Sequence, residues 1–492
     1  MKPWERLISE SNTYGKLISL IGFLLGAPLL TVPFFPEEAR FLPAFLIPSL
    51  FSILFGLFIC WRLPARERSV SVWQSSIERG SVPVIFAWFY AFFMGAMPFF
   101  IGGQLSFLHS LFEAVSGWTT TGMTVADIEE LPRIFLFHRS FMQFCGGLGF
   151  IILIAMLVHW KQSMSLYNAE GHPDRIRPSL QGTARIIFLL YTGCLLIGTF
   201  LFALFGMGWF DALNHAMTAL STAGSSTRDG NISEFRSVAI ELVTIILMLI
   251  GSSNFALLLL VLRRKFRQVF LNSEFRLMLQ LLLAAIPLIA WALMDQLGAT
   301  FSMGLRDAAF GVVAAISTTG FLVTDYFNWP PFALGLLLLL MHIGGSAGST
   351  AGGIKLARAH LLVKITKESI HRRMAPARQV RVPTYQRVSG KIRIDEALVE
   401  DTFGFVATYI FILIAGTLLL TLSADATLFE AFFEFSSAFS TVGISGGLTS
   451  ASANFGTLLI QMIAMILGRL EIFIVFIACY SMVHTWKKRF KN

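Results

Sequence analysis

Charged residues are scarce in this chain. Asp, Glu, Lys and Arg make up 14% of its 492 residues, whereas hydrophobic residues make up 55%. An ordinary soluble protein carries about a quarter charged residues, so a soluble globular fold is excluded. Apolar runs of about 18 or more residues, long enough to cross a bilayer as a helix, recur along the whole chain. The composition predicts a polytopic membrane protein embedded in a lipid bilayer.

Clustered reactive residues are lacking as well. The chain has 4 cysteines, far apart and without a Cys-x-x-Cys pair, which argues against redox and metal chemistry. The histidines in or beside apolar segments are scattered, with no His-x-x-His spacing: His138, His159, His342 and His360. A membrane-embedded enzyme, such as a lipid-modifying transferase, would need a cluster of this kind at the bilayer interface. We therefore expect a protein that is not an enzyme and that holds no cofactor.

The formal net charge of +9 could suggest a nucleic-acid partner, but the basic residues are distributed in another way. Of the 38 Lys and Arg residues, 31 lie in alternate loops and at the two ends of the chain. Excess Lys and Arg mark the cytoplasmic loops of a membrane protein. The pattern predicts that both termini are cytoplasmic and that nucleic acid is not a partner.

Four short segments along the chain resemble one another. Each consists of a hydroxyl residue, Thr, a small or β-branched residue and Gly: Thr119-Thr120-Thr121-Gly122, Ser221-Thr222-Ala223-Gly224, Ser317-Thr318-Thr319-Gly320 and Ser440-Thr441-Val442-Gly443. Before each glycine lies a mostly apolar stretch of about ten residues, too short to span a bilayer but suited to a re-entrant half-helix. One such segment alone is a common helix-packing feature. Four in register indicate a repeated unit.

The flanks of the four segments match too. Thirteen residues before each glycine stands a polar residue, and the acidic ones are expected to cap the half-helix: His109, Asp211, Asp307 and Glu430. A full apolar span precedes each half-helix, at about 81–101, 184–206, 276–298 and 401–422. Another follows it, at about 134–159, 237–262, 331–360 and 455–484. Two extra spans, about 16–35 and 43–62, come first, which gives ten spans.

The predicted fold is therefore an all-α polytopic membrane protein. It has four span–pore-helix–loop–span repeats around a pseudo-fourfold pore, plus two extra N-terminal transmembrane helices. We divide the chain into residues 1–79 (N-terminal start and extra helices), 80–160, 183–263 and 272–365 (pore repeats 1 to 3), 366–398 (basic cytoplasmic loop) and 399–492 (pore repeat 4 and basic tail).

This constellation suits a cation pathway. A cation that crosses hydrocarbon must be given oxygens in place of its water shell, and rings of backbone carbonyls supply them. Glycine lets the backbone point such carbonyls inward. A half-helix entering from outside also ends with its partly negative C-terminus near the pore centre. We predict an ion-binding selectivity filter formed by the Thr, its following residue and the Gly of each segment.

A second group of residues lies deeper and predicts a gate. The run Gly344-Gly345-Ser-Ala-Gly348-Ser-Thr-Ala-Gly352-Gly353 interrupts a span, and irregular backbone is tolerated at that depth only where it lines a cavity. A close helix-packing surface is the alternative. Arg469 lies inside the last span, where a charge is expensive and usually faces a water-filled cavity or a partner. Such a cation below the filter would restrain leakage, although a salt bridge joining two spans is also possible.

These residues resemble the Trk/Ktr/HKT superfamily of potassium transporters, most closely its bacterial TrkH/TrkG membrane subunits. The matching stretches are Thr119 to Gly122, Arg139 to Phe150 (RSFMQFCGGLGF), Gly344 to Lys355 (GGSAGSTAGGIK) and Leu467 to Phe473 (LGRLEIF). The likeness covers essentially the whole chain. It implies that 344–353 is the intramembrane gate loop and that Arg469 is the pore arginine.

The resemblance also implies potassium uptake across the bacterial inner membrane, a homodimer with one pore per protomer, and a cytoplasmic nucleotide-binding regulatory subunit of the TrkA type. In this superfamily a serine at the first filter glycine accompanies sodium transport, and Gly122 is intact. Ala223 and Val442 break the pattern, so a less selective sodium/potassium pathway stays open. A proton- or sodium-coupled potassium symporter is the other alternative, with Glu241 and Glu471 as candidate coupling acids.

Overall fold

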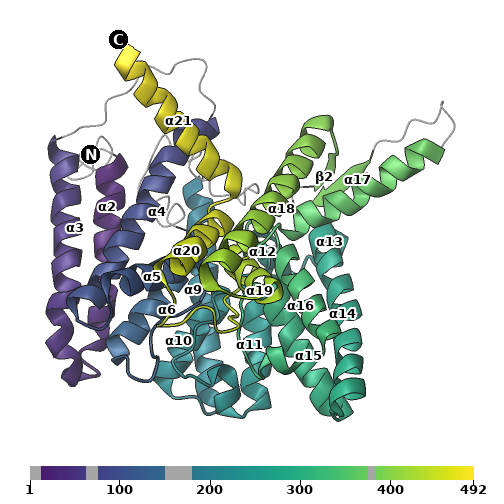
Figure 1. The fold of residues 1–492 in the computed structure, drawn as a ribbon, viewed down its shortest axis with the longest axis horizontal. Coiled ribbons are helices and arrows are strands. Elements are labelled where there is room, and N and C mark those ends of the chain that lie inside the picture. Colours follow the sequence, from purple (N-terminus) through teal and green to yellow (C-terminus); the bar gives the residue numbers. More distant parts are fainter. Residues whose placement is uncertain (1–12, 63–75, 150–179, 375–382, 389, 492) are drawn as a thin grey trace.

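The computed structural model describes residues 13–62, 76–149, 180–374, 383–388 and 390–491. It is built almost entirely of helices, many of them running in roughly the same direction, which confirms the predicted fold class (Figure 1). A two-stranded antiparallel hairpin, β1 (Thr384–Arg387) and β2 (Gly390–Arg393), was not predicted. It lies within the basic loop that the sequence analysis left without structure.

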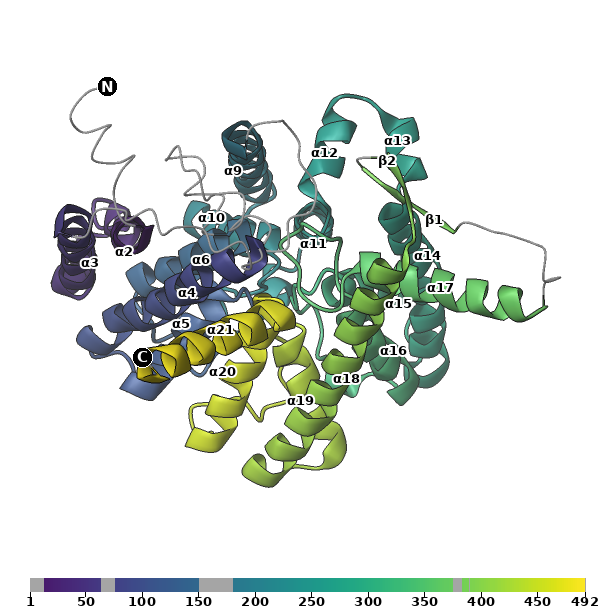
Figure 2. The same cartoon turned by 90° about the horizontal axis from the view of Figure 1, so that it is seen from above.

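The first two long helices, α2 (Thr13–Leu25) and α3 (Leu42–Arg62), form a pair at one side of the molecule (Figures 1 and 2). The short 3-10 helices η1 (Ala27–Thr31) and η2 (Pro36–Phe41) join them. Glycines bring their backbones together, since a Cβ at Gly56 would lie 2.5 Å from the carbonyl oxygen of Gly15. Small residues allow such close contact between membrane helices. The pair packs on α4 (Ser76–Ile101) and so flanks the first repeat.

Four structural units follow, each with a long helix, a short pore helix and a second helix (Figure 2). The long helices are α4, α9 (Leu180–Leu204), α14 (Ser273–Leu297) and α18 (Glu396–Ala424). The pore helices are α5 (Phe107–Trp118), α10 (Trp209–Leu220), α15 (Phe301–Ile316) and α19 (Leu428–Phe439). The second helices begin with α6 (Arg133–Leu148), α11 (Val238–Gly251), α16 (Pro331–Ile343) and α20 (Phe455–Arg469). The 3-10 turns η3 (Asn231–Phe235) and η4 (Tyr326–Asn328) lie in the outer loops.

Three of the second helices are interrupted within the described residues. The break in the third, at the run 344–353, was predicted, whereas the expectation of continuous spans at 237–262 and 455–484 was wrong. α11 is bent by 113° from α12 (Phe255–Leu262), and α20 by 102° from α21 (Ile472–Lys491). In the third unit a loop separates α16 from α17 (Leu356–Met374). The part of the first such span beyond residue 149 lies outside the described residues. α13 (Phe266–Leu271) connects the second and third units.

The described part of the chain has 6 helices long and apolar enough to cross a membrane, or up to 8 if each bent pair is one span. Their outward faces carry large apolar side chains that a bilayer would cover, such as Leu422 (84% exposed) and Phe411 (72% exposed). Charged pairs such as Arg139 with Glu113 are buried inside. This inversion of the usual polar surface is what a membrane protein requires.

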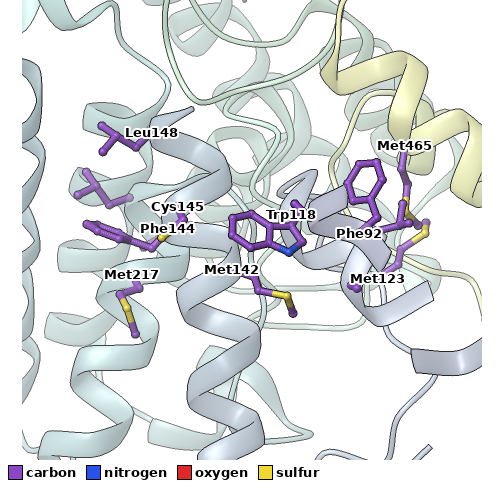
Figure 3. Packing of buried hydrophobic residues seen from close by; sticks show 14 of the residues in the cluster. Phe92, Trp118, Met123, Met142, Phe144, Cys145, Leu148, Met217 and Met465 are labelled. Atoms are coloured by element: carbon purple, nitrogen blue, oxygen red, sulfur yellow. The ribbon is translucent and has the colours of Figure 1, made fainter. Parts of the chain in front are cut away.

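The pore helices are held by tightly packed apolar residues. Figure 3 shows Trp118, the last residue of α5, beside Met142 of α6. Gly95 of α4 makes room for this pair, because a Cβ there would lie 2.6 Å from the Trp118 ring nitrogen and 3.1 Å from the Met142 sulfur. Trp118 and Met142 are each 1% exposed. Close packing of this kind fixes where the pore helix ends, and therefore where the filter segment begins.

Candidate ion pathway

All four pore helices end in the same left-handed turn. The Thr two residues before each filter glycine has positive φ: Thr120 (56°), Thr222 (54°), Thr318 (53°) and Thr441 (53°). In the first repeat the Thr121 amide donates to the Ser116 carbonyl at 3.0 Å, and the Thr120 amide donates to Gly117 at 3.1 Å. These two bonds define a Schellman cap, and the same pair of bonds recurs in the other three repeats.

Threonine at this position is unexpected. A Schellman cap normally has glycine there, and a β-branched residue at positive φ is strained by about 1–3 kcal/mol. Four copies of one strained residue at one structural position point to a functional use. The four segments share one residue pattern, but this pattern did not predict the positive φ of the Thr, because the backbone propensity of Thr disfavours that conformation.

The four filter glycines form a closed ring of contacts. A Cβ added at Gly122, Gly224, Gly320 or Gly443 would lie 1.9–2.0 Å from a backbone carbonyl oxygen of the next repeat. The oxygens belong, in that order, to Ala223, Thr319, Val442 and Thr121. Only glycine permits this approach, and each glycine also has positive φ. The structure thus brings all four predicted filter segments to one place, in cyclic order.

The helix starts differ from the prediction. The N-caps with side-chain hydrogen bonds are Ser106 of α5, Thr300 of α15 and Thr427 of α19. Glu430 completes a capping box with Thr427, as expected of an acid in the first turn. Asp307 is in the middle of α15, so its predicted capping role was wrong: α15 begins four residues, about one turn, earlier relative to its glycine than the other pore helices do.

In three of the four repeats, the buried residue nine positions before the filter glycine anchors the loop that follows the filter; the third repeat has Gly311 at this position. Glu113 accepts hydrogen bonds from the Thr124 hydroxyl at 2.6 Å and the Val125 amide at 2.8 Å. His215 bonds Ser226 at 2.9 Å in the second repeat. Glu434 accepts from Ser445 at 2.6 Å and from the Gly446 amide at 2.7 Å. Sequence reasoning missed these residues, although an acid within an apolar half-helix was the available signal.

The predicted gate loop lies directly against the filter. The Thr350 hydroxyl bonds that of Thr222 at 3.0 Å, and the Gly352 amide donates to the Thr318 hydroxyl at 2.8 Å. A Cβ at Gly352 would lie 2.2 Å from the Thr441 hydroxyl. Three of the four strained threonines therefore contact this loop. The loop occupies the end of the filter opposite to its outer loops.

The remaining predicted gate glycines shape the loop. Gly344, Gly348 and Gly353 have φ of 69°, 72° and 75°, the left-handed region that glycine adopts without strain. A Cβ at Gly344 would lie 2.1 Å from the Gly352 carbonyl oxygen, so the two ends of the loop touch. The Gly345 carbonyl accepts a hydrogen bond from the Leu356 amide at 2.9 Å.

Arg469 ties this loop to the first repeat. Its guanidinium donates to the Thr350 carbonyl, to the Gly146 carbonyl at 2.6 Å and to the Gly147 carbonyl at 3.2 Å. Arg469 thus joins main-chain oxygens of repeats 1 and 3 from its place in repeat 4. The nearby Glu471, proposed from the sequence as a coupling acid, forms an ion pair with Arg358 at 2.7 Å. Glu241, the other proposed coupling acid, pairs with Arg306.

Glycines near the ends of the second helices allow these helices to pack closely against the pore helices. A Cβ at Gly146, Gly251 or Gly468 would lie 2.0–2.3 Å from the carbonyl oxygen of the last pore-helix residue of its own repeat: Trp118, Leu220 and Phe439. Gly344, the corresponding glycine of repeat 3, instead meets Gly352 of the gate loop. In the third repeat this glycine therefore packs against the gate loop and not against the end of the pore helix.

Contacts from the hairpin β1–β2 reach the predicted gate loop through one carboxylate. Glu274, at the start of α14, accepts from the Ala347 amide at 2.8 Å and from the Tyr385 hydroxyl of β1 at 2.9 Å. Asn254 donates to the Ala347 carbonyl at 2.7 Å. Both polar groups of the Ala347 backbone are therefore held from outside the loop.

We expect Tyr385→Phe to loosen the loop without unfolding the protein. The change removes one hydrogen bond to a charged group, worth about 1.5–3 kcal/mol, and keeps the buried ring. Faster amide hydrogen exchange at residues 346–350, with unchanged exchange in α14, is the expected result. Phe405→Leu, a packing change at another helix, is the control. Unaltered exchange at 346–350 would show that the Tyr385 hydroxyl does not restrain the loop.

The fold defines a helical membrane protein in which the four predicted filter segments come together within one chain. Residues 44–485 match the TrkH family, described as "Cation transport protein". The chain belongs to this family. This confirms the resemblance inferred from the sequence motifs.

Individual relatives agree with this assignment. The Trk system potassium uptake protein TrkH of Halomonas elongata is 31% identical over 404 residues, covering 77% of this chain and 80% of the relative. The Trk system potassium uptake protein TrkG of Escherichia coli K12 is 29% identical, covering 94% and 96%. The crystal structure of the potassium transporter TrkH from Vibrio parahaemolyticus superposes with a TM-score of 0.82 at 26% identity, covering 94% of this chain and 96% of that one.

Proposed function

We propose that this chain is the membrane subunit of a potassium uptake system and conducts potassium through a gated pore within one protomer. The observation that supports this proposal most directly is the closed ring of four glycine-to-carbonyl contacts between successive repeats. A ring of backbone oxygens replaces the water shell of a cation. Relatives named Trk system potassium uptake protein support potassium as the ion.

The gate in this proposal is the loop 344–353 together with Arg469. In the described state the loop lies against three filter threonines, and Arg469 holds it by the Thr350 carbonyl. Opening would then require this loop to leave the filter and Arg469 to release its carbonyl partners. The ion pairs of Glu241 and Glu471 favour a pore over coupled symport, because a coupling acid must be free to exchange its proton or ion.

The proposal also covers the assembly and the location of the protein. We place the protein in the bacterial inner membrane with both termini in the cytoplasm, since basic residues gather in the loops on that side. A homodimer with one pore per protomer and a cytoplasmic nucleotide-binding regulatory subunit of the TrkA type are further parts of the proposal. The contact of the hairpin with Glu274 offers such a subunit a route to the gate loop.

Purified protein in liposomes loaded with potassium chloride is the direct test. We expect uptake of radioactive rubidium, driven by the potassium gradient, that external potassium suppresses and external sodium suppresses at least about ten times less well. A reversal potential that follows the potassium gradient alone would support the pore. A reversal potential that shifts with pH or sodium would establish coupled transport instead, and no cation flux at all would refute the proposal.

A further inference from the structure

Repeats 1 and 4 place a glutamate at the same point behind the filter. Glu113 bonds the residues two and three positions after Gly122, and Glu434 bonds the residues two and three positions after Gly443. Both side chains are buried, with exposures of 2% and 0%. Each carboxylate therefore lies just outside the ring of filter carbonyls, in a low-dielectric environment.

The surroundings of the two carboxylates differ in charge. Arg139, on the helix that follows the first filter, donates to Glu113 at 2.8 Å and neutralises it. Arg139 stands seven residues before Gly146, and the residue seven before the equivalent Gly468 is Gln461. The position that supplies a cation in repeat 1 thus supplies an uncharged amide in repeat 4.

Glu434 nevertheless has the environment of an ionised group. The Ser445 hydroxyl, the Gly446 amide and both the amide and hydroxyl of Thr449 bond it. These four are donors, which suits a carboxylate that can only accept. Because the Thr449 hydroxyl has a single proton and gives it to Glu434, the end of Gln461 that faces Thr449 is best assigned as its NH2 group. Across the described residues, no Lys or Arg forms an ion pair with Glu434.

We propose that Glu434 is a specificity- and affinity-determining residue of the filter, whose uncompensated negative charge draws the cation toward the fourth filter segment. The uncharged Thr449, itself hydrogen-bonded to Gln461, holds the carboxylate in place without cancelling its charge. In repeat 1 the same carboxylate position only anchors the loop, because Arg139 cancels its field. The inference rests on the proposed conduction through this filter.

The test is a series in which the charge behind the fourth segment is changed by two unrelated routes. Glu434→Gln and Gln461→Arg each raise the local charge by one unit, and the double variant raises it by two. We expect each single variant to raise the KM for rubidium uptake by about three- to tenfold, and the double variant to raise it by about the square of that factor, because Coulomb energies add. Asp425→Asn, which removes an exposed acid next to the same pore helix, is expected to leave KM within about twofold.

A purely structural role for Glu434 gives a different pattern. It predicts loss of Vmax and of thermal stability for Glu434→Gln, with no common KM change in Gln461→Arg. Single variants that leave KM unaltered, or that move it in opposite directions, would overturn the inference. Failure of this inference can be distinguished from failure of the proposed function. The proposed function fails if the unmodified protein takes up no rubidium, whereas the inference fails if that protein takes up rubidium and the variants leave KM unaltered. If either single variant fails to fold, the other still decides the sign of the effect.

Discussion

The Gly122→Ser protein is expected to lose most of its discrimination between rubidium and sodium. A Cβ at this position would lie 1.9 Å from the Ala223 carbonyl oxygen, and the residue has φ of 86°. The serine can be accommodated only if the Ala223 carbonyl moves away, which breaks one of the four contacts of the ring. A change of about 1.4 kcal/mol in the difference between the binding free energies of the two cations already reduces selectivity tenfold. The measurement is the ratio of rubidium to sodium uptake in liposomes.

The structure offers a matched control for this substitution. Gly103 lies in an outer loop of the same repeat and also has positive φ, 68°, but a Cβ there would meet nothing within 4 Å. Gly103→Ser therefore tests backbone strain without a carbonyl clash, and we expect it to keep the selectivity of the unmodified protein. Unchanged selectivity in Gly122→Ser would contradict the assignment of this segment to the filter.

The second large effect is expected from Arg469→Ala, which should raise cation flux at least about tenfold. Arg469 holds Thr350 of the gate loop and Gly146 of repeat 1 by their carbonyl oxygens. Each hydrogen bond from a charged donor contributes about 1.5–3 kcal/mol, so the held position of the loop loses much of its stability without them. The substitution also removes a positive charge from the predicted path of a cation.

Arg469→Lys separates these two contributions. Lysine keeps the charge but lacks the planar fork that spans two carbonyl groups. If Arg469 acts mainly by holding the loop, both variants should raise flux; if it acts mainly as an electrostatic barrier, only Arg469→Ala should do so. Arg228→Ala, at an exposed outer arginine paired with Asp211, is the control for removal of an arginine. Unchanged flux in Arg469→Ala would leave this residue a structural link between spans.

Much of the architecture could be predicted from the register of four short segments. Hydroxyl residues and glycines at matching positions, with matching spans around them, were enough to predict the four short helices and the four segments that the structure brings together. Hydrophobic length was less reliable. A long apolar run does not distinguish a straight helix from two helices bent by 113° or 102°, because both bury the same side chains.

The features missed from the sequence depend on contacts between distant segments. The left-handed Thr120 and its equivalents run against backbone propensity, and only the cap and the ring contacts explain them. The link from Tyr385 through Glu274 to Ala347 joins residues up to 111 positions apart. Likewise, the partner of Glu471 was not evident because Arg358 lies 113 residues away. Propensity and periodicity are local and carry no such information.

The ring of glycine contacts also bears on synthesis of the protein. Its last contact joins Gly443 to Thr121, so the ring cannot close until the fourth repeat has entered the membrane. The same holds for the bond between Arg469 and Gly146, 323 residues apart. An unfinished chain therefore lacks the complete ring, and the residues that close the ring arrive in the same repeat as Arg469. In the proposed mechanism, each new pore is thus completed together with the contact that holds its gate loop against the filter.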